Sequence, residues 1–445
     1  MTLSIRRYLY LFFIAAFLVI TTLVITYANG YSLLSRSGFF VKTGMLILDT
    51  EPQGAVIYLN NELQKNKLTP WNQKSLTTPA KIKNLIPGEY EVKLELAGYN
   101  TWQKKLTILP GQATFAETVI LFKKDTPIKL SELNVADFSL NFDNKLLALQ
   151  TNNKLVVINT TNSNEIYNLN YSGGLTWNKF SNLLLLTDGR IVNFTNQDEI
   201  STINSSISGK KPVWISATQF ASINNNNIQI YNTDQNSTQI IDAQKIGLAN
   251  FSDIAVKDRE LYAIGNSDSD KAAHLIIFNI DNLDVNQKIK LPGQGYTIIE
   301  VNKNLVALEN KKYSNLIIID KNSDQPLVTK ISNFKQLRWT DEQNIYYSNE
   351  HELYYVDLKN NKSQILARIS QNINDIYIHP SNNYLIFTTD TSINTLELDD
   401  RDHHNINNLV TADKIIKTNF DDKLLQFYYT VKNNDSVVIY KFFTK

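Results

Sequence analysis

Apolar and polar positions recur with a period of about 40 residues along the C-terminal part of the chain, from residue 125 to residue 445. Each unit has an apolar strand, a polar turn and a second apolar strand, and residues 375–390 are the clearest copy. Such a period is typical of the blades of a β-propeller. The last position of the first strand, predicted to be a repeated core position, is occupied in successive units by Leu140, Trp177, Trp214, Val256, Val301, Trp339, Ile378 and Thr418.

Further apolar runs complete the units. A third strand follows in every unit, for example at 154–159, and a fourth in seven units, for example at 165–170. Four antiparallel strands make one blade. The eighth unit has three strands, so we predict that the strand at 128–133, which precedes the first unit, completes it and removes two open sheet edges. The sequence thus predicts an eight-bladed propeller over 125–445, or seven blades if the irregular unit between Ile246 and Pro292 is not one.

The N-terminus carries an uncharged apolar run from Tyr8 to Tyr27, which is long enough to cross a bilayer. Arg6 and Arg7 precede it and indicate a cytoplasmic N-terminus. We therefore predict a cytoplasmic stub and transmembrane anchor at 1–28, a spacer at 29–43 and an extracytoplasmic remainder. A cleaved signal peptide ending near Ala28 is the alternative, although the run exceeds the roughly 7 to 15 apolar residues of such peptides.

Between residues 44 and 123 the period of apolar positions shortens to two, as in β-strands. Pro and Gly separate the short runs, which predicts a β-sandwich of about 80 residues. The prolines and glycines have structural roles at turns, since proline presets a turn and glycine adopts conformations closed to other residues. Tyr99 and Trp102 are predicted to pack on the sandwich core rather than to stack on a ligand.

The turn residues of this sandwich resemble the PEGA domain. Pro52-Gln53-Gly54-Ala55 has Gln53 where the family has an acidic residue, and the segment 62–77, with Thr69-Pro70-Trp71, is longer than the family's turn. The resemblance implies a surface-exposed, non-enzymatic module of cell-envelope proteins that contacts proteins or glycans. The matching positions are Pro52, Gly54, Ala55, Thr78, Pro79, Pro87, Gly88, Gly98, Tyr99, Pro110 and Gly111.

The repeat resembles TolB-like and WD-repeat-like propellers, in which a Pro-Asp-Gly turn leads into an apolar strand. In residues 379–387 the turn has Asn382-Asn383 in place of Asp-Gly. His379 has Asn141, Asn178, Ile215 and Thr340 as its counterparts in other units, so we interpret it as a turn-forming residue rather than a reagent.

Composition narrows the possible functions. The net charge of +1 argues against a nucleic-acid partner, and the lack of cysteine excludes disulfides and cysteine-bound zinc. No nucleophile elbow, phosphate loop or paired-histidine zinc signature is present, so we predict no catalytic residue, cofactor or metal. Residues 399–404 and 266–270 contain possible metal ligands, but solvated loops are favoured. The equivalence of Trp177, Trp214 and Trp339 favours packing between blades.

Two functions remain. The first is a membrane-anchored, extracytoplasmic cell-envelope scaffold that binds a protein or a surface glycan without catalysis. The second is an extracytoplasmic hydrolase with a carboxylate site at the propeller mouth. Fold alone does not separate them. Two carboxylates that converge at the mouth with raised pKa values would contradict the scaffold.

Overall fold

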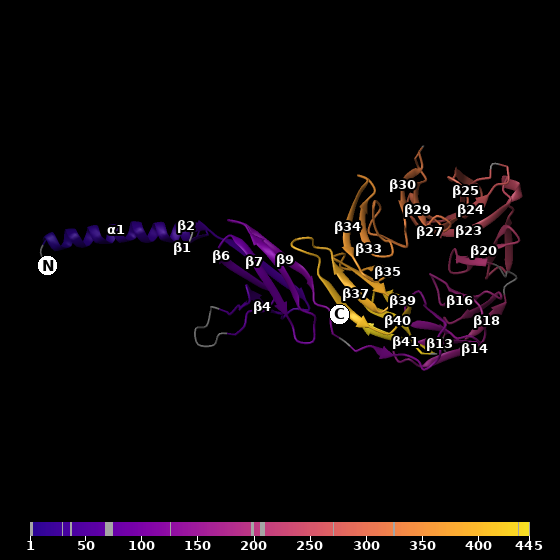
Figure 1. The fold of residues 1–445 in the computed structure, drawn as a ribbon, viewed down its shortest axis with the longest axis horizontal. Coiled ribbons are helices and arrows are strands. Elements are labelled where there is room, and N and C mark those ends of the chain that lie inside the picture. The colour runs from indigo at the N-terminus through magenta and orange to yellow at the C-terminus, as the bar shows by residue number, and fades with distance from the viewer. Residues whose placement is uncertain are drawn as a thin grey trace.

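A helix, a small sandwich and a series of four-stranded sheets follow one another along the long axis of the molecule (Figure 1). The computed structural model describes residues 3–28, 30–35, 38–66, 74–124, 126–196, 200–204, 210–269, 271–323, 325–434 and 436–444. Thr69-Pro70-Trp71 of the long segment 62–77 therefore lies outside the described residues, as does Asp270 of the segment 266–270.

The N-terminal helix α1 (Leu3–Ala28) is long and apolar enough to cross a membrane over Arg6–Ala28, as a signal sequence also is. None of this stretch is buried inside the protein, and α1 projects from the sandwich on the side away from the propeller sheets (Figure 1). Its exposed apolar side chains are those expected of a membrane span or of a signal sequence. The predicted spacer contains a hairpin that was not predicted, formed by β1 (Tyr31–Ser35) and β2 (Gly38–Lys42).

The sandwich packs two sheets face to face. One sheet has the order β6 (Ala80–Leu85), β3 (Gly44–Glu51), β9 (Ala113–Ile120), with β3 and β9 parallel. The other has the order β5 (Glu62–Leu63), β4 (Val56–Leu59), β7 (Gly88–Glu95), β8 (Trp102–Ile108). Alternate side chains of both sheets form one buried core. The sequence predicted this core but missed β6 and the parallel pairing.

The family-pattern residues shape this module. Gly54 (φ 98°) and Gly98 (φ 83°) lie in the left-handed region that favours glycine. The buried Thr78 hydroxyl accepts a hydrogen bond from the Ala55 amide (3.0 Å) and contacts the Thr50 hydroxyl at 2.6 Å. These residues therefore lie at turns and at the strand ends between them.

Eight four-stranded antiparallel sheets follow within the described residues. In seven of them the strands follow sequence order across the sheet, as in a propeller blade, and in the eighth the order is β10-β41-β40-β39. The sheets are β11 (Asp137–Leu140) to β14 (Glu165–Asn170) with β12 (Leu146–Gln150) and β13 (Lys154–Asn159); β15 (Leu175–Trp177), β16 (Leu183–Leu186), β17 (Arg190–Asn193) and β18 (Ser201–Asn204); β19 (Lys210–Trp214), β20 (Gln219–Asn224), β21 (Asn227–Asn232) and β22 (Ser237–Ile241); β23 (Asn250–Lys257), β24 (Glu260–Asn266), β25 (Ala273–Asn279) and β26 (Val285–Lys290); β27 (Tyr296–Asn302), β28 (Leu305–Asn310), β29 (Asn315–Asp320) and β30 (Leu327–Ser332); β31 (Gln336–Trp339), β32 (Asn344–Ser348), β33 (Glu352–Asp357) and β34 (Lys362–Arg368); β35 (Ile373–Ile378), β36 (Tyr384–Thr389), β37 (Ser392–Glu397) and β38 (Ile406–Thr411); and β10 (Ile128–Lys129) with β39 (Ile415–Asp421), β40 (Gln426–Asn433) and β41 (Ser436–Phe443).

The last of these sheets joins both ends of the repeat region. β10 pairs with β41 (Ile128 with Lys441), and the Leu130 amide donates to the Ile439 carbonyl at 3.0 Å. Leu130, Tyr428 and Ile439 share a buried core with side chains of β11 to β13. The last sheet therefore packs on the first, as the unpaired strand at 128–133 predicted. The irregular unit between Ile246 and Pro292 also forms a complete four-stranded sheet, preceded by a 3₁₀ turn at Gln244–Ile246.

Asparagines at one repeat position connect neighbouring sheets. The Asn141 side-chain amide donates to Oδ1 of Asn182 in the next sheet at 2.7 Å. The Asn178 amide donates to the Ser216 carbonyl at 3.0 Å, and the Asn302 amide donates to the next sheet in the same way. These are counterparts of His379, so three units use this position to connect consecutive turns rather than for chemistry.

Candidate functional site

The sandwich docks on one propeller sheet, β35 to β38, through buried polar and aromatic contacts. The Trp102 indole N–H donates to Glu397 Oε1 at 2.9 Å, and the Ile120 amide donates to the Tyr384 hydroxyl at 3.1 Å. Phe122 meets the Tyr384 ring edge-on, with 5.1 Å between ring centroids. Trp102 thus belongs to the sandwich core, as predicted, and also to a domain junction that was not predicted.

Lys104 is the central charge of this junction. Its side chain is fully buried, and Nζ lies 3.0 Å from Glu397 Oε2 and 3.7 Å from Asp399 Oδ2. It also donates to the Asp399 carbonyl at 2.7 Å, and Asn405 donates to Glu397 Oε2 at 2.7 Å. The buried pair therefore has most of its hydrogen-bonding positions satisfied, which a buried ion pair requires to be tolerated.

The acidic loop 399–404 lies between β37 and β38 with most of its side chains exposed, as predicted, and it also borders the junction, which was not predicted. Asp402 accepts from the Lys105 amide at 2.9 Å, and Arg401 donates to the Phe115 carbonyl at 2.8 Å. Burial opposes ionisation of Asp399, but hydrogen bonds from Arg401 and the charge of Lys104 hold its pKa below the usual value. Within the described residues, no three His, Asp or Glu side chains gather as a metal site would require.

His379 lies at this junction too. It is 4% exposed, its ring meets Phe122 edge-on with 5.9 Å between centroids, and Nδ1 lies 3.0 Å from the Ser381 hydroxyl. Residues 375–390, the clearest copy of the repeat, therefore form the inner hairpin of the sheet that carries the sandwich. Its histidine packs on Phe122 of the sandwich.

The repeated core positions lie on the innermost strands of their sheets. Trp177 and Trp214 are buried between consecutive sheets, and their indole N–H groups donate to the Ser139 and Thr176 carbonyls of the preceding sheets at 3.1 and 3.2 Å. Both tryptophans therefore pack between consecutive sheets. Trp339 packs in the same way, but its Nε1 is buried without a hydrogen-bond partner among the described residues. Leu140, Val256, Val301, Ile378 and Thr418 are buried or half-buried at equivalent points.

A cavity of about 360 Å³ opens at the end of the innermost strands β15, β19, β23 and β27. Its lining is mixed: Val213, Ile254 and Ile299 among others contribute apolar surface, and Lys179, Lys257 and Glu300 provide its charges. We call this cavity the channel mouth. A concave surface that combines apolar side chains with a few convergent charged groups is the usual form of a binding site.

The next innermost strands carry further charges. Burial raises the pKa of Glu300 on β27, although its side chain reaches solvent, and the charge of Arg338 on β31 opposes the rise. Burial likewise raises the pKa of Asp375 on β35, against a hydrogen bond from Thr418 (2.9 Å) and the charge of Arg338. Arg338 also lies over the Tyr377 ring, 5.4 Å from its centroid. The two carboxylates come from sheets separated by one sheet and do not bond each other, so the condition set for a hydrolase is met only in part.

Sequence reasoning missed Lys104, Glu300, Arg338 and Glu397. One signal was available for Lys104: in β8 it falls in the inward-facing set Trp102, Lys104, Leu106, Ile108, where an apolar residue is expected. A charge at such a position indicates a buried partner. Glu300 and Arg338 gave no such signal, because one sequence does not show which innermost strands face each other.

Comparison with known proteins agrees with this architecture. A family model described as PEGA domain matches residues 43–120. The search of curated proteins finds no match. Among solved structures, the C-terminal WD40 domain of Sif2 is 12% identical with a TM-score of 0.50, covering 72% of this chain and 98% of that one. A structure described as the eukaryotic initiation factor is 11% identical with a TM-score of 0.51, covering 73% of this chain and 90% of that one.

At such identities the solved structures show the fold and nothing of the function. The sandwich matches a family model, and the sheets that follow it match solved structures. Residues 43–120 are a PEGA domain, and the region that follows has the β-propeller fold of WD40 domains.

Proposed function

We propose that the protein is a single-pass membrane scaffold of the bacterial cell envelope, whose propeller binds a protein or surface glycan outside the cytoplasm. The buried junction of Lys104, Glu397 and Trp102 is the observation that carries this proposal. It fixes the propeller on the PEGA domain, and thereby on the anchor, instead of leaving the two on a flexible linker. A fixed spacer suits presentation of a binding surface at a set height above a membrane.

The eight sheets are, in this proposal, the blades of one closed ring, with β10 completing the last blade. The pairing of β10 with β41 and the core shared between the last and first sheets support closure. Closure leaves no inner strand edge open to aggregation. It also brings Glu300, Arg338 and Asp375 around one channel.

The channel mouth is the proposed partner site. Its apolar side chains offer burial for an aliphatic or aromatic anchor residue, and Lys179 and Lys257 favour an acidic neighbour. The partner segment is therefore a protein loop or terminus that carries apolar and acidic residues together.

Site-specific photo-crosslinking in intact cells tests this site. A photoreactive residue at Ile299, in the mouth, should give a discrete protein adduct, and the same residue at the exposed Ile240 of β22 should not. Lys257→Glu should weaken the Ile299 adduct. Equal adducts at both positions, or none at Ile299, would contradict a binding mouth.

Topology is tested separately. Carbonate washing should leave the full-length protein in the membrane fraction, and external protease on cells made permeable only at the outer surface should digest the chain beyond Tyr27. Full protection would contradict the proposed orientation, and release by carbonate would favour a cleaved signal peptide.

The second candidate is the hydrolase, which the raised pKa values of Glu300 and Asp375 on either side of Arg338 favour. A general acid needs a carboxyl that stays protonated near neutral pH. Full-length protein should then cleave members of a glycan and peptide panel, and both Glu300→Gln and Asp375→Asn should abolish cleavage. No turnover by the wild type, or turnover that survives both changes, would leave the scaffold.

A further inference from the structure

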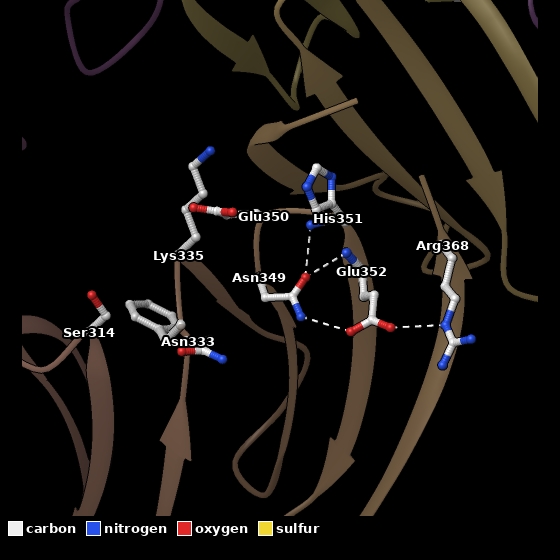
Figure 2. Close-up of a pocket in the computed structure, with 9 residues that line it drawn as sticks. Ser314, Asn333, Lys335, Asn349, Glu350, His351, Glu352 and Arg368 are labelled. Atoms are coloured by element: carbon white, nitrogen blue, oxygen red, sulfur yellow. Dashed lines mark hydrogen bonds and ion pairs between the residues drawn. The ribbon is translucent and has the colours of Figure 1, made fainter. Parts of the chain in front are cut away.

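A second cavity, of about 690 Å³, lies where sheet β27–β30 meets sheet β31–β34. Its lining comes from the turn before β29, the connection before β31, the turn before β33 and the end of β34 (Figure 2). These segments lie at the opposite end of the strands from the turns that frame the channel mouth, because strands alternate in direction within each sheet. We call this second cavity the rim pocket.

One side of the rim pocket is a fixed polar frame. Asn349 Oδ1 accepts from the amides of His351 (2.8 Å) and Glu352 (2.6 Å), and its Nδ2 donates to Glu352 Oε2 at 2.8 Å. Arg368 Nε donates to the other carboxylate oxygen of Glu352 at 2.9 Å (Figure 2). Hydrogen bonds from Tyr354 and Asn349 hold the pKa of Glu352 below its usual value, so the frame stays ionised and ordered near neutral pH.

The other side offers side chains that are not used by the protein. Glu350 and Asn333 line the pocket, and among the described residues neither side chain has a hydrogen-bond partner within the molecule (Figure 2). Ser314 adds a hydroxyl at the same rim. Carboxylate, amide and hydroxyl groups together supply acceptors and donors around one concave space.

The lining excludes several ligand classes. Lys335 and Arg368 balance Glu350 and Glu352, so the pocket favours neither an anion nor a cation. Phe334 is the one apolar residue of the lining and is 6% exposed, so a purely apolar ligand has no hydrophobic side chain to pack against. A neutral ligand with many hydroxyl groups remains, since each hydroxyl both donates and accepts.

We propose that the rim pocket binds a short neutral oligosaccharide, with Glu350, Asn333 and Ser314 contacting sugar hydroxyls and the Asn349, Glu352 and Arg368 frame holding the turn that carries Glu350. The volume lies within the range of about 300–1,000 Å³ usual for ligand sites. An extended peptide fits less well, because it needs an open strand edge or an apolar anchor pocket. This site is independent of the channel mouth, so it stands or fails separately from the proposed partner site.

Saturation-transfer NMR with full-length protein in nanodiscs tests the proposal. The probes are maltotriose, cellotriose and triacetylchitotriose as neutral trisaccharides, trigalacturonate as an acidic one, and a polar tripeptide. At least one neutral trisaccharide should receive saturation. Glu350→Ala and Asn333→Ala should each weaken it at least tenfold, because each removes hydrogen bonds to the ligand without touching the frame.

Glu342→Ala is the matched control, since Glu342 is an exposed glutamate in the same sheet at the opposite end. It should leave the signal unchanged. Melting temperatures close to that of the wild type would show that all three variants fold. The proposal is overturned if no neutral trisaccharide binds, if only trigalacturonate or the tripeptide binds, or if the Glu350→Ala and Asn333→Ala variants bind as the wild type does.

Discussion

Replacing Lys104 with methionine should uncouple the PEGA domain from the propeller. Methionine fills most of the volume of the lysine stem, so the change removes mainly the charge from a fully buried position. Glu397, 5% exposed, then loses its nearest cation and keeps only Trp102 and Asn405 as donors. Removing one partner of a buried ion pair typically costs about 3–5 kcal/mol. Asp399 is less affected because Arg401 still pairs with it at 2.6 Å.

Calorimetry of the full-length protein, with hydrogen exchange read by mass spectrometry, measures the effect. The junction segments around β8 and the loop 399–404 should exchange faster, while the core strands of the central sheets keep their protection. Lys105→Met is the matched control, because Lys105 is the next residue of the same strand and is exposed. Adding Glu397→Leu to Lys104→Met should recover part of the loss. If the Lys104 variant exchanges at the junction as slowly as the Lys105 variant, the junction does not depend on this ion pair.

Three further outcomes are expected. Trp177→Phe should lower stability in urea by about 1 kcal/mol more than Trp339→Phe, because only Trp177 loses a hydrogen bond, and equal losses would contradict this. Burial raises the pKa of the Asp375 carboxyl above its ordinary value of 3.8. The protonated carboxyl therefore stabilises the fold at low pH, and this stabilisation is lost as the pH rises through the pKa of the folded state. Asp375→Asn should raise the melting temperature more at pH 7 than at pH 4. Leu130→Ala should cost about 2–5 kcal/mol and increase hydrogen exchange in β41 but not in β25, whereas an unchanged β41 would argue against closure by β10.

The sequence was informative wherever the structure repeats a local pattern. Trp177 and Trp214 recur at one spacing because each inner strand buries its last residue against the preceding sheet, and one sequence holds enough copies to reveal the rule. The turns of the PEGA domain were predictable for a different reason. Glycines such as Gly54 and Gly98 adopt backbone conformations that few other residues tolerate, so the local sequence is enough to predict these turns.

The junction and the pockets were not predictable in the same way. Lys104 and Glu397 are far apart in sequence and each occurs once, so no repetition marks them. Turns from two sheets form the rim pocket, so the role of Glu350 depends on which polar groups of the neighbouring turn have no hydrogen-bond partner. The acidic loop 399–404 shows a further limit, because most of it is exposed, as its composition suggested, while Arg401 and Asp402 bond backbone groups of another domain.

The docking of the PEGA domain also restricts where a partner can come from. Sheet β35–β38 carries the sandwich on the loop after β37 and the turn after β35, and the channel mouth opens at the same end of the innermost strands. In Figure 1 the innermost strands β23, β27, β35 and β39 lie around a common centre and α1 lies in the plane of the view, so the channel between these strands runs across the direction of α1. The PEGA domain stands beside the sheets at that end of β35, and it covers one side of the approach to the mouth. A partner therefore has to reach the mouth from the sides that the PEGA domain leaves open.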